Sequence, residues 1–255
     1  MRKILIIGMG AGDPDYMTVQ AINAVNQVDV FFIPDKGAEK ADLRKLRVEI
    51  CERFIKERTY RFVEMATPKR AKEFSDYRSN VAEWHASIEK NYKRLLMEEL
   101  ADGQCGAFLI WGDPTLYDST LRIIDRLRAD GFALEYEVIP GISAVQALAA
   151  KHRVALNRIG EPVLITPARK FVEDLPNTVD STVVVLDGEQ SFKRVDGEAF
   201  DIYWGAYLGT PQEILIAGKL SEVMGEIETA RKTARQENGW IMDTYLLRKR
   251  HSESE

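Results

Sequence analysis

The sequence is poor in the residues that build disulfide frameworks and metal centres. Only two cysteines occur among 255 residues, Cys51 and Cys105, together with only three histidines. Two cysteines cannot form a disulfide framework, and their scarcity favours a reducing compartment, so we expect a cytoplasmic protein. The histidines are scattered and no CxxC pair is present, so the ligand spacing of a zinc site is lacking and we expect no metal.

Long apolar runs are missing as well. No stretch approaches the roughly 20 residues that cross a bilayer, so we expect no membrane segment. The first apolar run, Ile4–Ile7, is too short for the core of a signal peptide and leads directly into a glycine turn. The length of 255 residues fits one large domain or two of ordinary size.

Short apolar runs alternate with helical patterns over residues 1–156. Apolar strands separated by helices predict an α/β domain with a largely parallel sheet. We also expect a long helical insert at about 37–104. The expected strands are 3–8, 28–34, 106–111 and 135–140, and the expected helices are 18–27, 41–57, a long one within 70–101, 116–130 and 143–151.

The pattern changes near residue 157. Apolar segments now lie closer together, several of them alternate, and fewer helices separate them, which predicts a second α/β domain with a mixed sheet over 157–255. Its expected strands lie within 163–166, 182–186, 201–208, 213–220 and 240–249.

The segment Gly8–Thr18 (GMGAGDPDYMT) follows the first strand and begins like a dinucleotide-binding loop. In the GxGxxG fingerprint the helix opens directly at the third glycine. Here that glycine comes one residue early, and Asp13 would repel a pyrophosphate. Thr18 is the better N-cap for the helix. Asp35 ends the second strand, as a ribose-binding acid would, so a nicotinamide-dependent oxidoreductase or a non-catalytic nucleotide-binding module stays an alternative.

Two further glycine turns follow strands in the same way. Gly112–Pro114 repeats the Gly-Asp-Pro tripeptide, and Pro140–Ser143 places Ser143 where it can cap the next helix. Ligands bind at these strand ends in open parallel sheets, and glycine lets the backbone approach a ligand closely. We therefore expect the three turns to converge on one crevice.

This ordered set resembles the tetrapyrrole (corrin/porphyrin) methylase family, whose pattern runs GxGxGDxxxxT, GDPxxY and PGxS/T. The segment 208–220 (LGTPQEILIAGKL) is similar to the part of the family's second domain that closes over the cofactor. The resemblance implies two α/β domains with S-adenosyl-L-methionine in a cleft between them, a small tetrapyrrole substrate, and a homodimer. Position 11, proline in many relatives, is alanine here. The implied cofactor contacts are Gly10, Ala11, Trp111, Gly112, Asp113, Leu116, Ser143, Ala144, Leu186 or Asp187, Gly209 and Thr210.

Within the family, the segments 29–37, 42–51 and 111–120 are most similar to the members that act on precorrin-5 in cobalamin biosynthesis. The resemblance implies that C1 loses its acetyl group as acetate and gains a methyl group, leaving S-adenosyl-L-homocysteine. A methylase of another corrin precursor, or of RNA or protein, is the alternative. RNA binding calls for a broader basic surface than a chain with a pI near 5.5 offers.

Deacetylation asks for a general base and a donor to the oxyanion. Asp35 is the expected base, and Tyr117 is expected to donate a hydrogen bond to the ring or to stack on it. The stretch 36–72 holds twelve Lys or Arg against six Asp or Glu, and such cations bind carboxylates well. The residues expected to bind the carboxylates of the macrocycle are Lys36, Lys40, Arg44 and Arg47.

Overall fold

The computed structural model describes residues 1–35, 41–66, 77–173 and 179–250. Contacts along the chain divide it into two compact units. Unit 1 consists of Met1–Gly10 and Pro14–Ile142, and unit 2 consists of Ala11–Asp13 and Ser143–Glu255. The sequence pattern changes near residue 157, after a helix, whereas the division into units falls before that helix.

Unit 1 is built on a parallel sheet of five strands in the order β3-β2-β4-β1-β5. Within it, β1 pairs in parallel with both β4 and β5. Ile4–Ile7 of β1 are fully buried, because helices cover both faces of the sheet. The strands are β1 (Arg2–Gly8), β2 (Val30–Asp35), β3 (Arg61–Ala66), β4 (Cys105–Ile110) and β5 (Leu134–Ile139).

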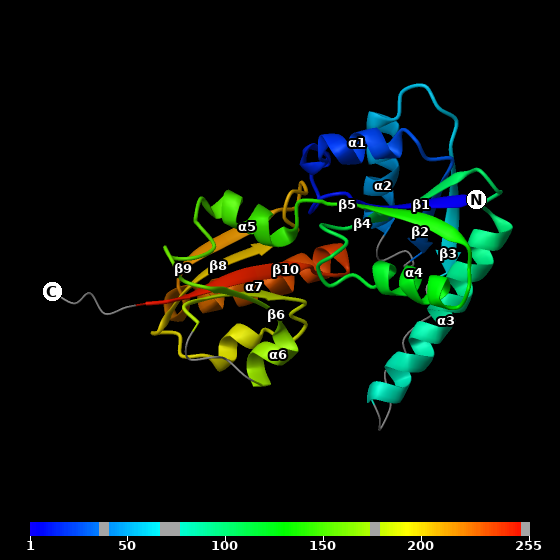
Figure 1. The fold of residues 1–255 in the computed structure, drawn as a ribbon. Coiled ribbons are helices and arrows are strands. Elements are labelled where there is room, and N and C mark those ends of the chain that lie inside the picture. The colour runs from blue at the N-terminus through cyan, green and yellow to red at the C-terminus, as the bar shows by residue number, and fades with distance from the viewer. Residues whose placement is uncertain (36–40, 67–76, 174–178, 251–255) are drawn as a thin grey trace. The chain divides into compact units, whose positions relative to one another are not determined.

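Among the residues that the structure describes, four helices cover this sheet. α1 (Val19–Val25) and α2 (Ala41–Phe54) pack on one face, and α3 (Tyr77–Glu98) and α4 (Thr120–Ala129) pack on the other (Figure 1). Thr18 caps α1, because its Oγ1 accepts a hydrogen bond from the Ala21 amide at 3.0 Å. The N-cap predicted from the sequence is therefore confirmed.

The strand β3 was not expected. It lies inside the segment 37–104, which the sequence pattern predicts as a helical insert, and it pairs in parallel with β2 along its whole length. It is an edge strand whose side chains alternate, with Val63 and Met65 buried and Glu64 between them exposed. The insert thus adds a strand to the sheet as well as α2 and α3.

Unit 2 contains a mixed sheet of five strands in the order β6-β7-β10-β8-β9. β6 and β7 are parallel and the other pairs are antiparallel, so the predicted mixed sheet is confirmed. The strands are β6 (Val163–Pro167), β7 (Ser181–Val185), β8 (Phe200–Ala206), β9 (Ile214–Lys219) and β10 (Asp243–Lys249).

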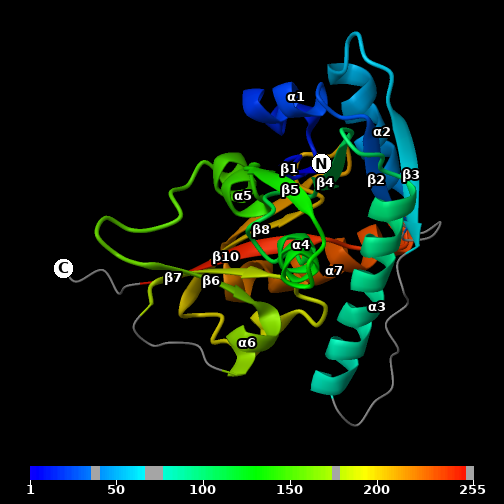
Figure 2. The same ribbon diagram turned by 45° about the vertical axis from the view of Figure 1, so that its right-hand side comes forward.

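In the described part of unit 2, three helices flank the sheet. α5 (Ala144–His152) lies on one side, and α6 (Ala168–Glu173) and α7 (Leu220–Asn238) lie on the other (Figures 1 and 2). Ser143 caps α5 in a capping box with Gln146, as the sequence predicts. Across the described ranges, no helix combines the length and the apolar character that a bilayer crossing requires.

Candidate active site

The three glycine turns meet at the carboxyl ends of the strands in unit 1. Gly10 and Gly112 form an isolated antiparallel bridge, in which the Gly112 amide donates to the Gly10 carbonyl at 2.8 Å. Gly141 packs so closely against both neighbouring turns that a Cβ on it would lie 2.2 Å from the Gly112 carbonyl oxygen and 2.8 Å from the Gly8 Cα. Only backbone fits between these turns, and the expected convergence is therefore present within unit 1.

Asp113 ties two of the turns together. Its Oδ2 accepts a hydrogen bond from the Gly141 amide at 2.9 Å, and its Oδ1 accepts one from the Thr115 amide at 2.8 Å and one from the Thr115 hydroxyl. Burial alone would raise the pKa of Asp113, but these hydrogen bonds outweigh it and lower that pKa. The carboxylate shapes the loops and stays ionised at neutral pH.

The middle of the first glycine turn, Ala11–Asp13, belongs to unit 2. Gly12 has a φ of +138°, and a Cβ there would lie 2.4 Å from the Leu208 carbonyl oxygen. The neighbouring Gly209 amide donates to the Glu213 carboxylate at 2.7 Å. Gly12, which follows the implied cofactor contact Ala11, therefore packs against the turn that holds the implied contacts Gly209 and Thr210.

Leu186 follows β7 in an unusual conformation. Its φ is +57°, in the left-handed region that costs a non-glycine residue roughly 1–2 kcal/mol, and its side chain is 68% exposed. A cavity of about 350 Å³ lies beside it, lined among others by Leu186, Glu189 and Arg194. Leu186 therefore leaves apolar surface exposed at the end of β7 in a strained backbone conformation.

Asp187, the next residue, is buried and supports this turn. Its carboxylate accepts hydrogen bonds from the Ser191 amide at 2.6 Å, the Glu189 amide at 2.9 Å and the Tyr245 hydroxyl at 2.8 Å. Burial raises the pKa of Tyr245, which keeps that hydroxyl protonated as a donor. The Asp187 side chain is therefore used internally, and Leu186 is the member of the pair that faces outward.

A buried ion pair lies behind Asp187. Arg231 donates through Nε to Asp243 at 2.9 Å and through Nη2 to the Asp187 carbonyl at 2.5 Å. The Trp204 indole also donates to Asp243, at 3.0 Å. Burial raises the pKa of Asp243, and Arg231 counteracts that rise. We call Asp187, Trp204, Arg231, Asp243 and Tyr245 the Asp187 cluster.

A cavity of about 210 Å³ opens in unit 1 where β2 and β4 separate. The two strands pair only as far as Phe32 and Phe108, after which β2 continues beside β3 alone. Pro34 lacks the N–H group that would extend a ladder. The apolar walls of the cavity are formed by Phe32, Met65, Ile88, Leu95, Phe108 and Ile123.

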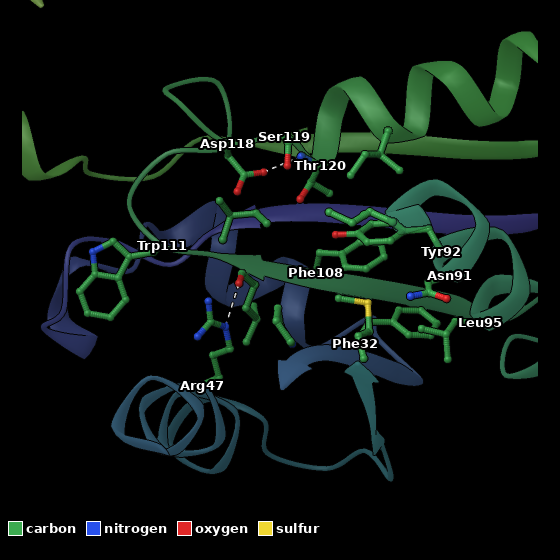
Figure 3. A pocket seen from close by; sticks show the side chains of 16 residues that line it. Phe32, Arg47, Asn91, Tyr92, Leu95, Phe108, Trp111, Asp118, Ser119 and Thr120 are labelled. Atoms are coloured by element: carbon green, nitrogen blue, oxygen red, sulfur yellow. Dashed lines mark hydrogen bonds between the residues drawn. The ribbon is translucent and has the colours of Figure 1, made fainter. Parts of the chain in front are cut away.

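Arg47 lies at the wall of this cavity (Figure 3). It is only 6% exposed. Its Nε donates to the Leu109 carbonyl at 3.0 Å and its Nη1 to the Leu43 carbonyl at 2.7 Å. Burial lowers the pKa of Arg47 to about 10, partly opposed by the charge of Asp118. The guanidinium therefore remains a buried cation at neutral pH.

Asp118 and Tyr92 supply further polar groups to the same cavity. Asp118 is half-buried, and its Oδ1 accepts a hydrogen bond from the Thr120 amide at 2.7 Å, which caps the start of α4 (Figure 3). The Tyr92 hydroxyl is hydrogen-bonded to the Thr120 side chain, and burial raises the pKa of Tyr92 to about 12. The cavity thus combines apolar walls with a cation, a carboxylate and a neutral phenol.

Comparison with known proteins identifies the family. The model of the Tetrapyrrole (Corrin/Porphyrin) Methylases matches residues 3–224. The chain belongs to this family. A relative from Sinorhizobium sp. named precorrin-6A synthase [deacetylating] is 53% identical over 250 residues, which span 98% of this chain and 96% of the relative.

Solved structures of tetrapyrrole methylases share the fold. A protein from Corynebacterium diphtheriae described as cobalamin-synthesis-related (CobF) superposes with a TM-score of 0.83 at 36% identity, over 98% of this chain and 99% of that one. A uroporphyrin-III C-methyltransferase from Thermus thermophilus, complexed with S-adenosylhomocysteine, gives a TM-score of 0.56 at 14% identity, over 96% of both chains. The predicted family, fold class and class of S-adenosyl-L-methionine-dependent methyltransferase are confirmed.

The implied cofactor contacts of this methylase fall on the loops described above. Three polar residues among these contacts, Asp113, Ser143 and Asp187, use their side chains for hydrogen bonds to nearby backbone amides. The Ser143 Oγ, for example, accepts a hydrogen bond from the Val145 amide at 3.1 Å. Trp111 lines the cavity beside β4, and Leu116 is half-buried in the same loop.

The residues expected to act on the substrate differ in their surroundings: some are exposed, one is buried, and two lie outside the described residues. Asp35 is the last residue of β2, and Lys36 and Lys40 lie outside the described residues. Arg44 forms an ion pair with Glu64 at 3.0 Å, with both side chains at least half exposed. Tyr117 is 46% exposed and has a φ of +58°. Arg47 is buried in the cavity rather than exposed beside them.

Sequence reasoning missed several polar residues of the cavity, Asp118 and Tyr92 among them. Asp118 precedes Ser119 and Thr120 at the start of an apolar-patterned helix, which is a recognisable capping signal. Tyr92 lies within the long helix α3, and nothing local distinguishes it from a core residue. Its position beside Phe108, with ring centroids 4.9 Å apart, depends on the tertiary fold.

Proposed function

We propose that this methylase is a precorrin-6A synthase of the deacetylating type. It methylates C1 of precorrin-5 from S-adenosyl-L-methionine and releases acetate, forming precorrin-6A and S-adenosyl-L-homocysteine. The observation that carries the proposal is the 53% identity, over 98% of the chain, to the Sinorhizobium relative that has this name. The segments 29–37, 42–51 and 111–120 had already indicated the same reaction from the sequence.

The described residues fit an S-adenosyl-L-methionine site. When bound, this cofactor supplies an electrophilic methyl group on a sulfonium. The glycine turns offer closely packed backbone without side chains, and Leu186 offers exposed apolar surface on a turn held by the Asp187 cluster. The proposed contacts are Gly10, Ala11, Trp111, Gly112, Asp113, Leu116, Ser143, Ala144, Leu186, Asp187, Gly209 and Thr210.

The substrate side of the site is proposed at the carboxyl ends of β2 and β4. Asp35 is the candidate general base from the sequence, and Tyr117 is the candidate donor or stacking partner for the ring. The cations proposed to bind the macrocycle carboxylates are Lys36, Lys40, Arg44 and Arg47. If Asp35→Asn leaves acetate release unchanged, the assignment of Asp35 as base is wrong.

The test of the function is incubation of the purified chain with precorrin-5 and S-adenosyl-L-methionine. We expect acetate in an enzymatic assay and a product whose mass corresponds to the loss of the acetyl group and the gain of one methyl group. A methylated product without acetate would indicate another corrin precursor methylase. Calorimetric titration with NADH provides the comparison, since tight NADH binding without S-adenosyl-L-methionine binding would support the oxidoreductase alternative.

Assembly and location complete the proposal. A homodimer in the cytoplasm follows from the family resemblance and from the scarcity of cysteine. Light scattering after size-exclusion chromatography should give twice the chain mass of 29.0 kDa. A monomer mass across the micromolar range would contradict the dimer and leave the proposed reaction unaffected.

A further inference from the structure

We infer that the cavity between the separated ends of β2 and β4 is an acyl subsite, which receives the acetyl group that leaves C1. In this subsite Arg47 binds the acetyl oxygen and Asp118 accepts a proton from the attacking water. The inference rests on the proposed function, because only a deacetylating reaction needs such a subsite. It makes Asp118 a catalytic residue that competes with Asp35 for the role of base.

The size and lining of the cavity suit a small acyl group. Its volume of about 210 Å³ compares with roughly 30 Å³ for one water in the liquid, so a side group and a water fit whereas a macrocycle does not. Phe32, Leu95, Phe108 and Ile123 form apolar walls that match a methyl group. The cavity also lies at the carboxyl edge of a parallel sheet, where ligands bind in such folds.

Arg47 gives the cavity its attraction for a negatively polarised oxygen. The cation is 6% exposed, and its two hydrogen bonds go to neutral carbonyl oxygens. The charge of Asp118 offsets part of the cost of burying this cation, but the neutral hydrogen-bond partners leave the rest of that cost in place. An oxyanion that forms at the acetyl carbon would reduce this cost, so Arg47 stabilises the intermediate more than the ground state.

Asp118 is placed to serve water in the same cavity. One hydrogen bond, from the Thr120 amide, occupies part of its Oδ1, and a carboxylate has about four lone-pair positions. It lies at the end of the loop 111–119, whose first residues, Trp111–Asp113, are proposed cofactor contacts. The acyl subsite and the wall of the methyl-donor site therefore belong to one short loop.

The step balances in atoms and electrons. Water adds to the acetyl carbonyl carbon while Asp118 takes one of its protons, and the carbonyl oxygen becomes an oxyanion beside Arg47. The oxyanion collapses to a carboxyl group, and the bond between C1 and the acetyl carbon breaks. The acetic acid that leaves ionises to acetate, and its proton and the one held by Asp118 pass to solvent. The electron pair of the broken bond stays on the macrocycle at C1, which is then nucleophilic toward the methyl group.

The experiment compares four full-length variants with the wild-type chain in single turnovers of precorrin-5. Asp118→Asn keeps a capping oxygen for α4 because Asn caps helices as well as Asp does. Ile123→Phe fills the cavity. Asp35→Asn tests the competing base, and Asp125→Asn, an exposed residue of α4 that pairs with Tyr136, is the matched control. Acetate release, methyl transfer and the Kd of S-adenosyl-L-methionine are measured for each.

We expect Asp118→Asn to slow acetate release by at least about 100-fold, the usual minimum for loss of a general base. Its Kd for S-adenosyl-L-methionine should stay within about threefold of the wild-type value, which a merely structural defect in this loop would not allow. Ile123→Phe should lose acetate release through weaker binding of precorrin-5, and Asp125→Asn should match the wild type.

Acetate release within about threefold of the wild-type rate in Asp118→Asn would overturn the role of Asp118. Undiminished release in Ile123→Phe would overturn the acyl subsite itself. A wild-type chain that methylates a corrin precursor without releasing acetate would refute the proposed deacetylating function, and the subsite with it. These three outcomes are distinguishable in the same set of measurements.

Discussion

Replacing Arg231 with methionine should destabilise unit 2 severely. In the Asp187 cluster, Arg231 is 5% exposed and Asp243 is 6% exposed, and their ion pair measures 2.9 Å. Removing one partner of a buried pair leaves the other charge uncompensated, which costs about 3–5 kcal/mol. That is a large share of the 5–15 kcal/mol that stabilises a typical domain. Arg231→Met also removes the donor to the Asp187 carbonyl.

Urea unfolding at pH 7 measures this loss of stability. Tryptophan fluorescence is one probe, because the Trp204 indole donates to Asp243, and far-UV circular dichroism is the other. Asp243→Asn and the double variant complete a thermodynamic cycle. We expect the double variant to be more stable than Arg231→Met alone, because it has no buried charge. Free energies that add within about 0.5 kcal/mol would refute the reasoning.

The pH dependence of the stability loss in Arg231→Met provides a second test of the buried charge. Burial raises the folded-state pKa of Asp243, and Arg231 lowers it again, so Arg231→Met raises that pKa further. A carboxyl whose folded pKa is raised takes up a proton on folding, and its stabilising contribution is present at low pH and lost as pH rises through the folded pKa. The penalty of Arg231→Met should therefore shrink as the pH falls from 7 toward 5. A constant penalty would contradict a buried carboxylate.

Three smaller predictions concern individual residues. Gly141→Ala should abolish S-adenosyl-L-methionine binding in calorimetry, since its Cβ would lie 2.2 Å from the Gly112 carbonyl oxygen, whereas Gly225→Ala meets nothing within 4 Å and should stabilise α7 by up to about 1 kcal/mol. Normal binding by Gly141→Ala would disprove the close approach of the turns. Burial raises the pKa of Cys51 to about 12, so iodoacetamide at pH 8 should modify Cys105 first and Cys51 only as the chain unfolds, as peptide mass spectrometry would show.

Most of the fold could be predicted because its signals are local. Buried strands such as Ile4–Ile7 are continuous apolar runs, and Thr18 and Ser143 are capping residues at the expected positions. The convergence of the glycine turns also followed, because parallel strands bring their carboxyl ends to one edge. β3 was missed because it is an edge strand whose exposed Arg61 and Glu64 resemble those of a solvent-exposed helix.

The candidate site was harder to predict because burial depends on tertiary structure. Arg47 and Arg44 lie three residues apart on α2 and look equivalent in sequence. Arg47 is buried and donates to the Leu109 carbonyl of β4, whereas Arg44 forms an exposed ion pair with Glu64. In the same way, nothing local shows that Asp187 serves the interior while Leu186 faces outward.

Unit 2 is assembled from two stretches of the gene that lie far apart. Residues 11–13 belong to it, and Gly12 packs against the Leu208 carbonyl. An expression fragment that starts at residue 143 would consequently lack part of its own structure. Swapping the C-terminal halves of two methylases would replace the turn 208–210 but keep the original residues 11–13 that pack against it. Substitutions in the N-terminal loop therefore have to be compatible with a segment almost two hundred residues away.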